Sequence, residues 1–169
     1  MKKLEFASHP ANLGLVRNCV RQFLQDRGFP NRQVDLMVLG IDEACTNIIR
    51  HAYHLAEDKL ITLALESHPK GVRFRLRDYG EQAEAAKVQG RPLDHVRPGG
   101  LGLHLIHHAF DQVDYQRRRQ GTMLVLTKFA PENLLMSSQV TKQKRRQTGE
   151  RAGPESQSSS HRNNTEPKR

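Results

Sequence analysis

The spacing of apolar residues changes once along this chain, and that change constrains the fold more than any other feature. Apolar residues recur every three or four positions within residues 13–24 and again within 34–52, which predicts two amphipathic helices. After His54 the period falls to two, so residues 60–67 and 72–79 are predicted strands. Helices followed by strands in this way favour an α+β fold, in which the helices lie against one face of a sheet.

Four further elements complete the predicted domain. A strand is predicted at residues 2–8, a short helix at 101–110, and two strands at 112–119 and 122–129 that join at Gln120-Gly121. We therefore expect a two-layer sandwich with a mixed, largely antiparallel sheet covered by helices on one face, spanning residues 1–130. The stretch at about residues 80–100 has no periodicity, and loops of this length are commonly lids or binding loops.

The remaining residues, 131–169, differ from the domain in composition. They hold eight Lys or Arg against four Asp or Glu, within a formal net charge of +9 for the whole chain. Beyond Ser137 they contain one aliphatic residue larger than alanine, Val140, and no aromatic residue, so we expect a disordered basic tail. The cluster Lys142, Lys144, Arg145 and Arg146 suits weak, salt-dependent contact with nucleic acid, or else a purely solubilising extension.

Two cysteines bear on the cellular compartment. Cys19 and Cys45 each lie inside an apolar-periodic stretch, which favours free buried thiols over a disulfide framework. The chain has no apolar run of the ~18 residues that a membrane span needs, and its N-terminus lacks the apolar core of a signal peptide. These features predict a cytoplasmic protein.

The segment Ile41–Tyr53, IDEACTNIIRHAY, carries the first candidate site. Glu43, Asn47 and His51 have the spacing i, i+4, i+8, which places them along one face of an uninterrupted helix. An amide oxygen suits Mg²⁺, and a carboxylate one turn earlier suits a general base. Taken alone, the pattern also fits an ordinary solvated polar face.

Two glycine-containing segments carry the other candidates. Gly99, Gly100 and Gly102 come directly before the apolar positions Leu103, Ile106 and Phe110 of a predicted helix. Backbone N–H groups and the helix N-terminus suit phosphate there; a flexible hinge is the alternative. Asp78-Tyr79-Gly80 ends a strand, and its carboxylate suits the exocyclic amine of adenine; an ordinary turn is the alternative.

The order of these pieces is more specific than any one of them. DEACTNIIRHAY, RDYG, PGGLGLHLI and the late GTMLVLTK resemble the N, G1 and G2 boxes and the closing Gly-Thr of the GHKL ATPase superfamily. Within it, the chain resembles stand-alone anti-sigma-factor serine/threonine kinases of partner-switching systems. Too few residues precede Asn31 for the dimerisation helices of a histidine kinase. The resemblance covers roughly residues 4–129 and implies a Bergerat-type ATP-binding fold.

This resemblance assigns roles to individual residues. Glu43 would be the catalytic base and Asn47 the Mg²⁺ ligand, while His51 and Tyr53 would support the helix. The remaining residues would bind ATP: Asp78 and Gly80 at the adenine, Gly99, Gly100, Leu101 and Gly102 at the phosphates, and Thr122 near the adenine pocket. One departure concerns the G1 box, where many relatives have a second glycine and this chain has Gln82. Another is that only Arg91 and Arg97 are candidate γ-phosphate clamps in the loop.

The resemblance also implies partners. The chain would phosphorylate an anti-anti-sigma protein of the STAS type, sequester a sigma factor, and act as a homodimer. The alternative function is an ATP-dependent protein-binding switch without relevant kinase activity. Glu43 favours the kinase, since a pure binding module has no need of a base.

Overall fold

A computed structural model describes residues 1–82 and 101–131 of the chain. The strands are β1 (Lys2–Ala7), β2 (Leu60–His68), β3 (Gly71–Arg77), β4 (Gln112–Arg117) and β5 (Thr122–Phe129). The helices are α1 (Leu13–Gln25), α2 (Asn31–Asn47) and α4 (Leu101–Ala109), with a 3-10 turn η1 (Pro10–Asn12) and a π-helical turn η2 (Ile48–Ala52). The predicted order of elements is confirmed, and the strand ends differ from the expected ones by two residues at most. Most of the expected lid and nearly all of the tail lie outside the described residues.

The five strands form one sheet in the order β1-β2-β3-β5-β4. Every neighbouring pair is antiparallel, so the expectation of a mixed sheet is wrong for the described strands. The reason is the path after α4: β4 takes the edge position, and the returning strand β5 is the one that pairs with β3. This places the ends of β3 and the start of β5 side by side, with Arg77 opposite Met123.

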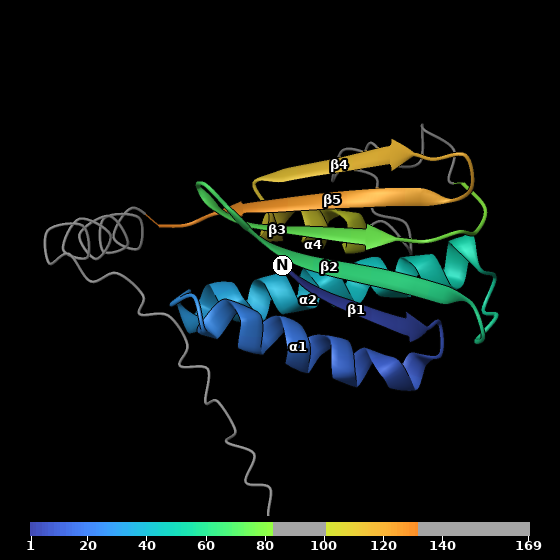
Figure 1. Ribbon diagram of the computed structural model, residues 1–169, viewed down its shortest axis with the longest axis horizontal. Coiled ribbons are helices and arrows are strands. Elements are labelled where there is room, and N and C mark those ends of the chain that lie inside the picture. The colour runs from blue at the N-terminus through green and yellow to red at the C-terminus, as the bar shows by residue number, and fades with distance from the viewer. Residues whose placement is uncertain (83–100, 132–169) are drawn as a thin grey trace, which may run out of the picture.

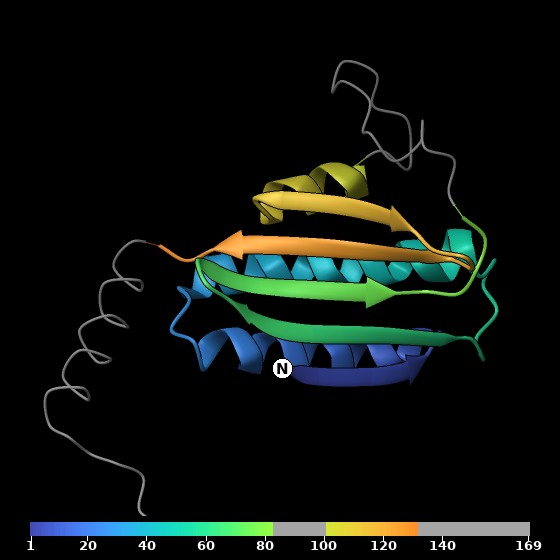
Figure 2. The ribbon, with the colours of Figure 1, turned by 45° about the horizontal axis from the view of Figure 1, so that its top comes forward.

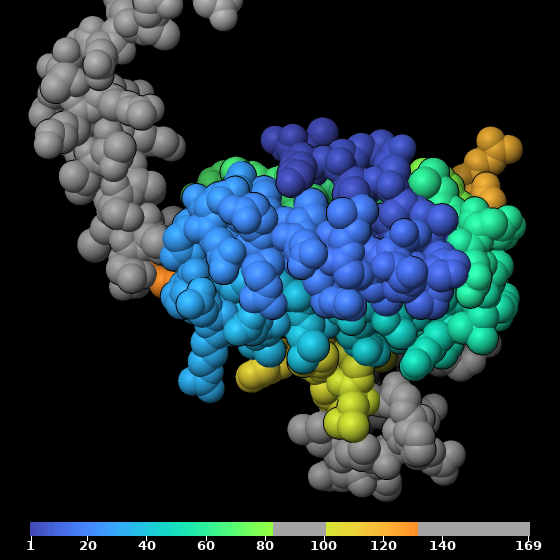
Figure 3. Space-filling view, turned by 90° about the horizontal axis from the view of Figure 1, so that it is seen from below, coloured from blue at the N-terminus to red at the C-terminus, as the bar shows by residue number. Residues whose placement is uncertain are grey.

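Helices α1, α2 and α4 cover one face of this sheet (Figures 1 and 2). From below, α1 and α2 occupy most of the helical face, and α4 lies at the edge of that face beside α2 (Figure 3). Phe74 of β3 joins the two layers, because its ring packs edge-on against Phe23 of α1 and Phe110 after α4, with ring centroids 5.8 Å apart in each pair. Such pairs add stabilisation beyond the area that they bury.

The apolar positions predicted in the helices form the core. All five such positions in α1 are buried: Leu13, Val16, Val20, Phe23 and Leu24. From the strands, alternate residues complete it, including Ile61, Leu63 and Leu65 of β2 and Leu76 of β3. Cys45 is a buried free thiol, and Cys19 is free and partly buried. None of the helices within residues 1–82 and 101–131 has the length and apolar character that crossing a bilayer requires.

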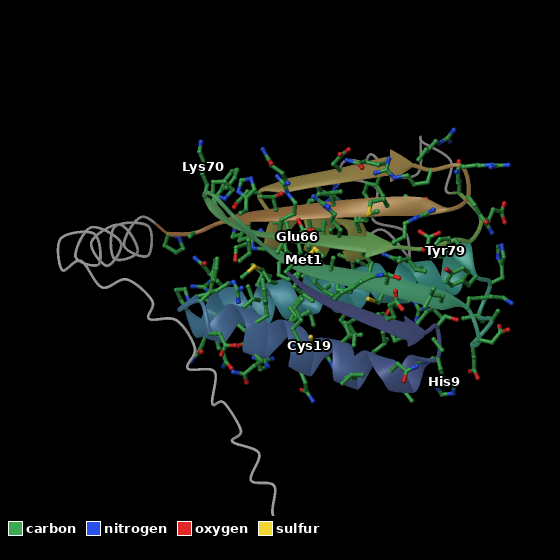
Figure 4. All side chains as sticks on the ribbon, in the orientation of Figure 1. Met1, His9, Cys19, Glu66, Lys70 and Tyr79 are labelled. Atoms are coloured by element: carbon green, nitrogen blue, oxygen red, sulfur yellow. The ribbon has the colours of Figure 1, made fainter. Side chains whose placement is uncertain are left out.

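The opposite face of the sheet is polar. Arg73, Arg75 and Arg77 alternate with the buried residues of β3 and point to this side. Glu66 of β2, labelled in Figure 4, pairs with Arg75 at 3.2 Å. No helix among the described residues packs on this face, which agrees with the two-layer expectation.

The helix that was expected to continue to Tyr53 changes form after Asn47. Residues 48–52 make a π-helical turn, in which the N–H of Tyr53 donates to the carbonyl of Ile48 at 3.0 Å. An i+5 bond adds one residue to the turn, so α-helical spacing does not carry beyond Asn47. The His51 side chain is exposed, and its place on the face of Glu43 and Asn47 stays a prediction.

Candidate functional site

The site begins with a close crossing of α2 and α4. A methyl group at Gly40 of α2 would lie 2.9 Å from Cβ of Ala109 and 3.0 Å from Cε2 of Phe110. Glycine therefore lets the two helices approach more closely than any other residue at this position would allow. Glycine inside a helix costs about 1 kcal/mol relative to alanine, and this close packing gives the position a structural reason. Sequence analysis missed Gly40, although an isolated glycine in a helical pattern is a recognised signal.

One turn further along α2, Glu43 meets the start of α4. Any Cβ at Gly102 would overlap the carboxylate of Glu43, so the carboxylate lies directly against the Gly102 backbone. The structure thus brings together two residues that lie 59 positions apart in the sequence and that were predicted to share one site. A carboxylate beside the N-terminal turn of a helix lies where unpaired N–H groups are concentrated.

Asn47, the last residue of α2, is partly buried and follows Glu43 by four residues on the same helix. None of the side-chain hydrogen bonds among the described residues uses its amide. The role of Asn47 in metal binding stays a prediction.

Asp78 lies just beyond β3 and is 3% exposed. Its Oδ1 accepts hydrogen bonds from the N–H of Gly80 at 3.1 Å and the N–H of Thr122 at 3.2 Å. Burial raises the pKa of the Asp78 carboxyl, although these backbone hydrogen bonds act in the opposite direction. The second oxygen, Oδ2, takes part in no hydrogen bond among the described residues, so the carboxylate keeps one acceptor for a ligand.

Thr122 begins β5 and is tied to Asp78 through its backbone. The N–H of Asp78 donates to the Thr122 carbonyl at 3.1 Å, in addition to the bond from the Thr122 N–H. Gly121, just before it, has a φ of +66°, and a Cβ there would overlap the carbonyl of Asp78. Glycine is needed at this position both for its backbone angle and for room. The structure therefore places Asp78 beside the closing Gly-Thr, while the roles of Asp78 and Thr122 at adenine stay predictions.

Gly80 packs against the end of η2. A Cβ on Gly80 would overlap the carbonyl oxygen of Ala52 and would lie 2.8 Å from Cδ1 of Tyr53. The next residue, Glu81, donates its N–H to the same Ala52 carbonyl at 2.9 Å. Packing against Ala52 and Tyr53 thus explains why position 80 needs glycine, and contact of Gly80 with a base stays a prediction.

Arg77 supports the same segment from the polar face of the sheet. Its guanidinium donates to the carbonyls of Asp78, Thr122 and Gln120, the last two at 3.0 and 2.5 Å. It also stacks over the ring of Tyr79, 4.4 Å from the centroid. Beside it lies an open hollow of about 610 Å³, lined by Arg77, Tyr79, Arg119 and Gln120, which contains none of the predicted ATP-binding residues. Sequence analysis missed Arg77.

Gln82 occupies the position where many relatives have a second glycine. Its side-chain amide donates to the carbonyls of Arg118 at 2.6 Å and Gly121 at 3.0 Å. The side chain therefore ties the start of the loop to the turn between β4 and β5. This departure from the family pattern adds hydrogen bonds next to Thr122.

Leu101 is the first residue of α4 and is 65% exposed. Gly99 and Gly100, with Arg91 and Arg97, lie outside the described residues. Phosphate binding at residues 99–102 thus stays a prediction whose described part is Gly102. The described site residues fall into two groups, one on α2 and α4 and the other at the end of β3 and the start of β5.

Comparison with known proteins agrees with this arrangement. Residues 6–128 match the family model of the histidine kinase-like ATPase domain. The serine-protein kinase RsbW of Oceanobacillus iheyensis is 23% identical over 138 residues, 77% of this chain and 87% of that protein. The serine/threonine-protein kinase BtrW of Bordetella bronchiseptica is 33% identical over 102 residues, 57% of this chain and 72% of that protein.

One solved structure shows the same fold. The RsbU and RsbW domains of a Mycobacterium tuberculosis protein superpose with a TM-score of 0.52 at 19% identity, over 78% of this chain. This chain spans 35% of the length of that solved chain. Since the family model matches well over half of the sequence, the chain belongs to the histidine kinase-like ATPase domain family.

Proposed function

We propose that this chain is an ATP-dependent serine/threonine protein kinase that acts as an anti-sigma factor. Its substrate would be a serine on an anti-anti-sigma protein of the STAS type, and its second partner a sigma factor. The observation that carries the proposal is the contact between the Glu43 carboxylate and Gly102. This contact would bring a general base to the part of the site where the phosphates are expected.

The described residues fit ATP with Mg²⁺. Asp78 offers an unused carboxylate oxygen in a buried position, which suits the exocyclic amine of adenine. The Asn47 amide would hold Mg²⁺, which prefers oxygen ligands and neutralises charge on the phosphates. The phosphates would lie near the N-terminal turn of α4, because a helix N-terminus favours negative charge.

Transfer of the γ-phosphoryl group asks a protein mainly for positioning and charge stabilisation. Glu43 would accept the proton of the acceptor serine hydroxyl as the oxygen attacks phosphorus. ADP would leave along the opposite direction, and the proton would end on the Glu43 carboxylate. A protein that only bound ATP would have no need of this carboxylate.

The test uses the purified full chain, ATP with Mg²⁺, and a STAS-domain protein encoded by a neighbouring gene. Mass spectrometry should find one phosphate on a serine or threonine of the partner. ATP binding without any phosphate on the partner would favour the second candidate, a protein-binding switch that responds to ATP. A dimeric mass of the free chain in solution would support the homodimer that relatives imply.

A further inference from the structure

The hydroxyl of Tyr53 lies between two backbone groups that belong to different strand ends. It donates to the carbonyl of Leu60 at 2.5 Å and accepts from the N–H of Tyr79 at 2.8 Å. The side chain is 7% exposed, and its ring lies against the backbone of Gly80. Both described hydrogen bonds of the buried Tyr53 hydroxyl therefore go to backbone groups, and they hold two segments of the chain together.

These two hydrogen bonds replace a backbone hydrogen bond that is missing at the end of the β2-β3 pairing. Thr62 of β2 lies opposite Arg77 of β3, so counting outward puts Leu60 opposite Tyr79. In a regular antiparallel ladder, the N–H of Tyr79 would donate directly to the carbonyl of Leu60. Here the Tyr53 hydroxyl stands between them and holds the end of β3 away from β2.

A second side chain does the same on the other side of this segment. The N–H of Asp78 donates to the Thr122 carbonyl, as in a ladder, but the N–H of Thr122 donates to Oδ1 of Asp78 instead of to its carbonyl. At residues 78–80 a side-chain oxygen therefore replaces the backbone partner on both sides: the Tyr53 hydroxyl toward β2 and the Asp78 carboxylate toward β5. The location of Asp78 depends on both.

Figure 4 shows Tyr79 just beyond the end of β3, at the end of the molecule where α2 gives way to η2. The π-helical turn brings Tyr53 to this position, because its extra residue changes the direction in which the following side chain points. Together with the contacts of Ala52 with Gly80 and Glu81, Tyr53 therefore links the end of the Glu43-Asn47 helix to the Asp78 segment.

We propose that Tyr53 is a positioning residue for base recognition, whose hydroxyl sets the location of Asp78 so that the free carboxylate oxygen meets the exocyclic amine of adenine. This inference rests on the proposed ATP site and deepens it. Tyr53 does not contact the nucleotide; it acts through the backbone of Tyr79. Without the hydroxyl, the two backbone groups either pair directly or lose their partner, and Asp78 moves in both cases.

The experiment compares Tyr53→Phe with the parent chain in two titrations, with ATP and with inosine triphosphate, which has an oxo group in place of the amine. We expect the parent to prefer ATP. In Tyr53→Phe the Kd for ATP should rise about tenfold, as expected when the hydrogen bond from the adenine amine to the charged Asp78 carboxylate is misplaced. The Kd for inosine triphosphate should stay the same, so the preference for ATP should fall by about the same factor.

Each other outcome overturns the inference. An equal loss of affinity for both nucleotides would mean that Tyr53 only maintains the fold, and an unchanged preference would mean that it does not position Asp78. A parent without preference for ATP would overturn the proposed adenine site together with this inference. A parent that prefers ATP, with a variant that prefers it equally, would overturn this inference alone.

Two controls make the result specific. Tyr115→Phe removes a hydroxyl from a partly buried tyrosine that makes no side-chain hydrogen bond among the described residues, and both Kd values should be unchanged. In an Asp78→Asn background, Tyr53→Phe should cost no further ATP affinity. Should Tyr53→Phe fail to fold, hydrogen exchange in the parent decides: the Tyr79 amide must be protected, and fast exchange would overturn the inference.

Discussion

The carboxylate of Glu43 lies against the backbone of Gly102, with no room for a methyl group between them. This contact makes the general base of the proposed reaction and the start of the phosphate-binding helix a single packing unit. Two substitutions perturb this unit in different ways: one removes the basicity of Glu43, and the other adds a methyl group at Gly102.

Glu43→Gln should retain ATP binding and lose phosphoryl transfer. The amide keeps the size of the side chain but cannot accept a proton, so the rate should fall by about 10²–10⁴-fold. Transfer of phosphate to the partner in single-turnover assays measures this. Asp42→Asn is the matched control, because Asp42 faces α1 and pairs with Arg17 at 2.8 Å. Transfer by Glu43→Gln at the parent's rate would remove Glu43 as the base.

Gly102→Ala should reduce activity more than stability. The new methyl group overlaps the end of the flexible Glu43 side chain, which can rotate away, so the free energy of unfolding should change by less than about 1 kcal/mol. Phosphoryl transfer should fall at least about tenfold, as expected when a catalytic group is misplaced by 1 Å or so. Gly14→Ala in the first turn of α1 is the control. Its Cβ would meet only Arg17 at 3.8 Å, so it should stabilise the helix without affecting activity. Full activity of Gly102→Ala would show that the contact with Glu43 has no functional role.

Gly40→Ala should destabilise the protein even though alanine favours helices. A methyl group at 2.9 Å from Cβ of Ala109 forces α4 away from α2, and overpacking of this kind typically costs about 1–3 kcal/mol. Chemical denaturation should show a lower midpoint with an unchanged slope. A variant as stable as the parent would mean that the two helices separate at no cost.

ATP affinity should decline as the pH falls, and the decline should begin at a higher pH than an ordinary aspartate would give. Burial raises the pKa of Asp78 above its ordinary value of 3.8. The ionised carboxylate accepts a stronger hydrogen bond from the adenine amine than the protonated carboxyl does. Titrations of ATP binding at several pH values measure this. Asp78→Asn should bind ATP more weakly and lack this decline. An equal decline in Asp78→Asn would assign the effect to another group.

The same carboxyl predicts the opposite trend for stability of the free protein. A pKa that is higher in the folded state than in the unfolded state contributes stability fully below the unfolded pKa, and this contribution is lost as the pH rises through the folded pKa. Asp78→Asn should therefore lack this loss. The difference in unfolding free energy between parent and Asp78→Asn, followed from below pH 3.8 upward, gives the sign.

Much of the fold was predictable because the spacing of apolar residues along the chain encodes its helices and strands. The buried face of α1 and the alternation in β3 follow directly from apolar spacing, which is a local property. The direction of every strand pair was less accessible, because the pairing of β5 with β3 and the edge position of β4 are long-range features that local spacing does not encode.

The site was predictable in part for a similar reason. Glu43, Asp78 and Gly102 belong to segments whose order along the chain is distinctive, so their proximity could be expected. Tyr53, Arg77 and Gln82 act through backbone groups of distant segments, and backbone carbonyls leave no trace in the sequence. Gly40 was recognisable in principle as a helix-interior glycine, but its partner Ala109 was not.

Because of the π-helical turn at η2, the direction in which Tyr53 points depends on the number of residues between Asn47 and Tyr53. Deleting one residue there would let the turn relax into α-helix and would rotate every following side chain by about one residue's step of 100°. The tyrosine ring would leave the sheet edge while Glu43 stayed in place. Among proteins with this site, the length of this segment should therefore be less free to vary than the identity of its exposed residues.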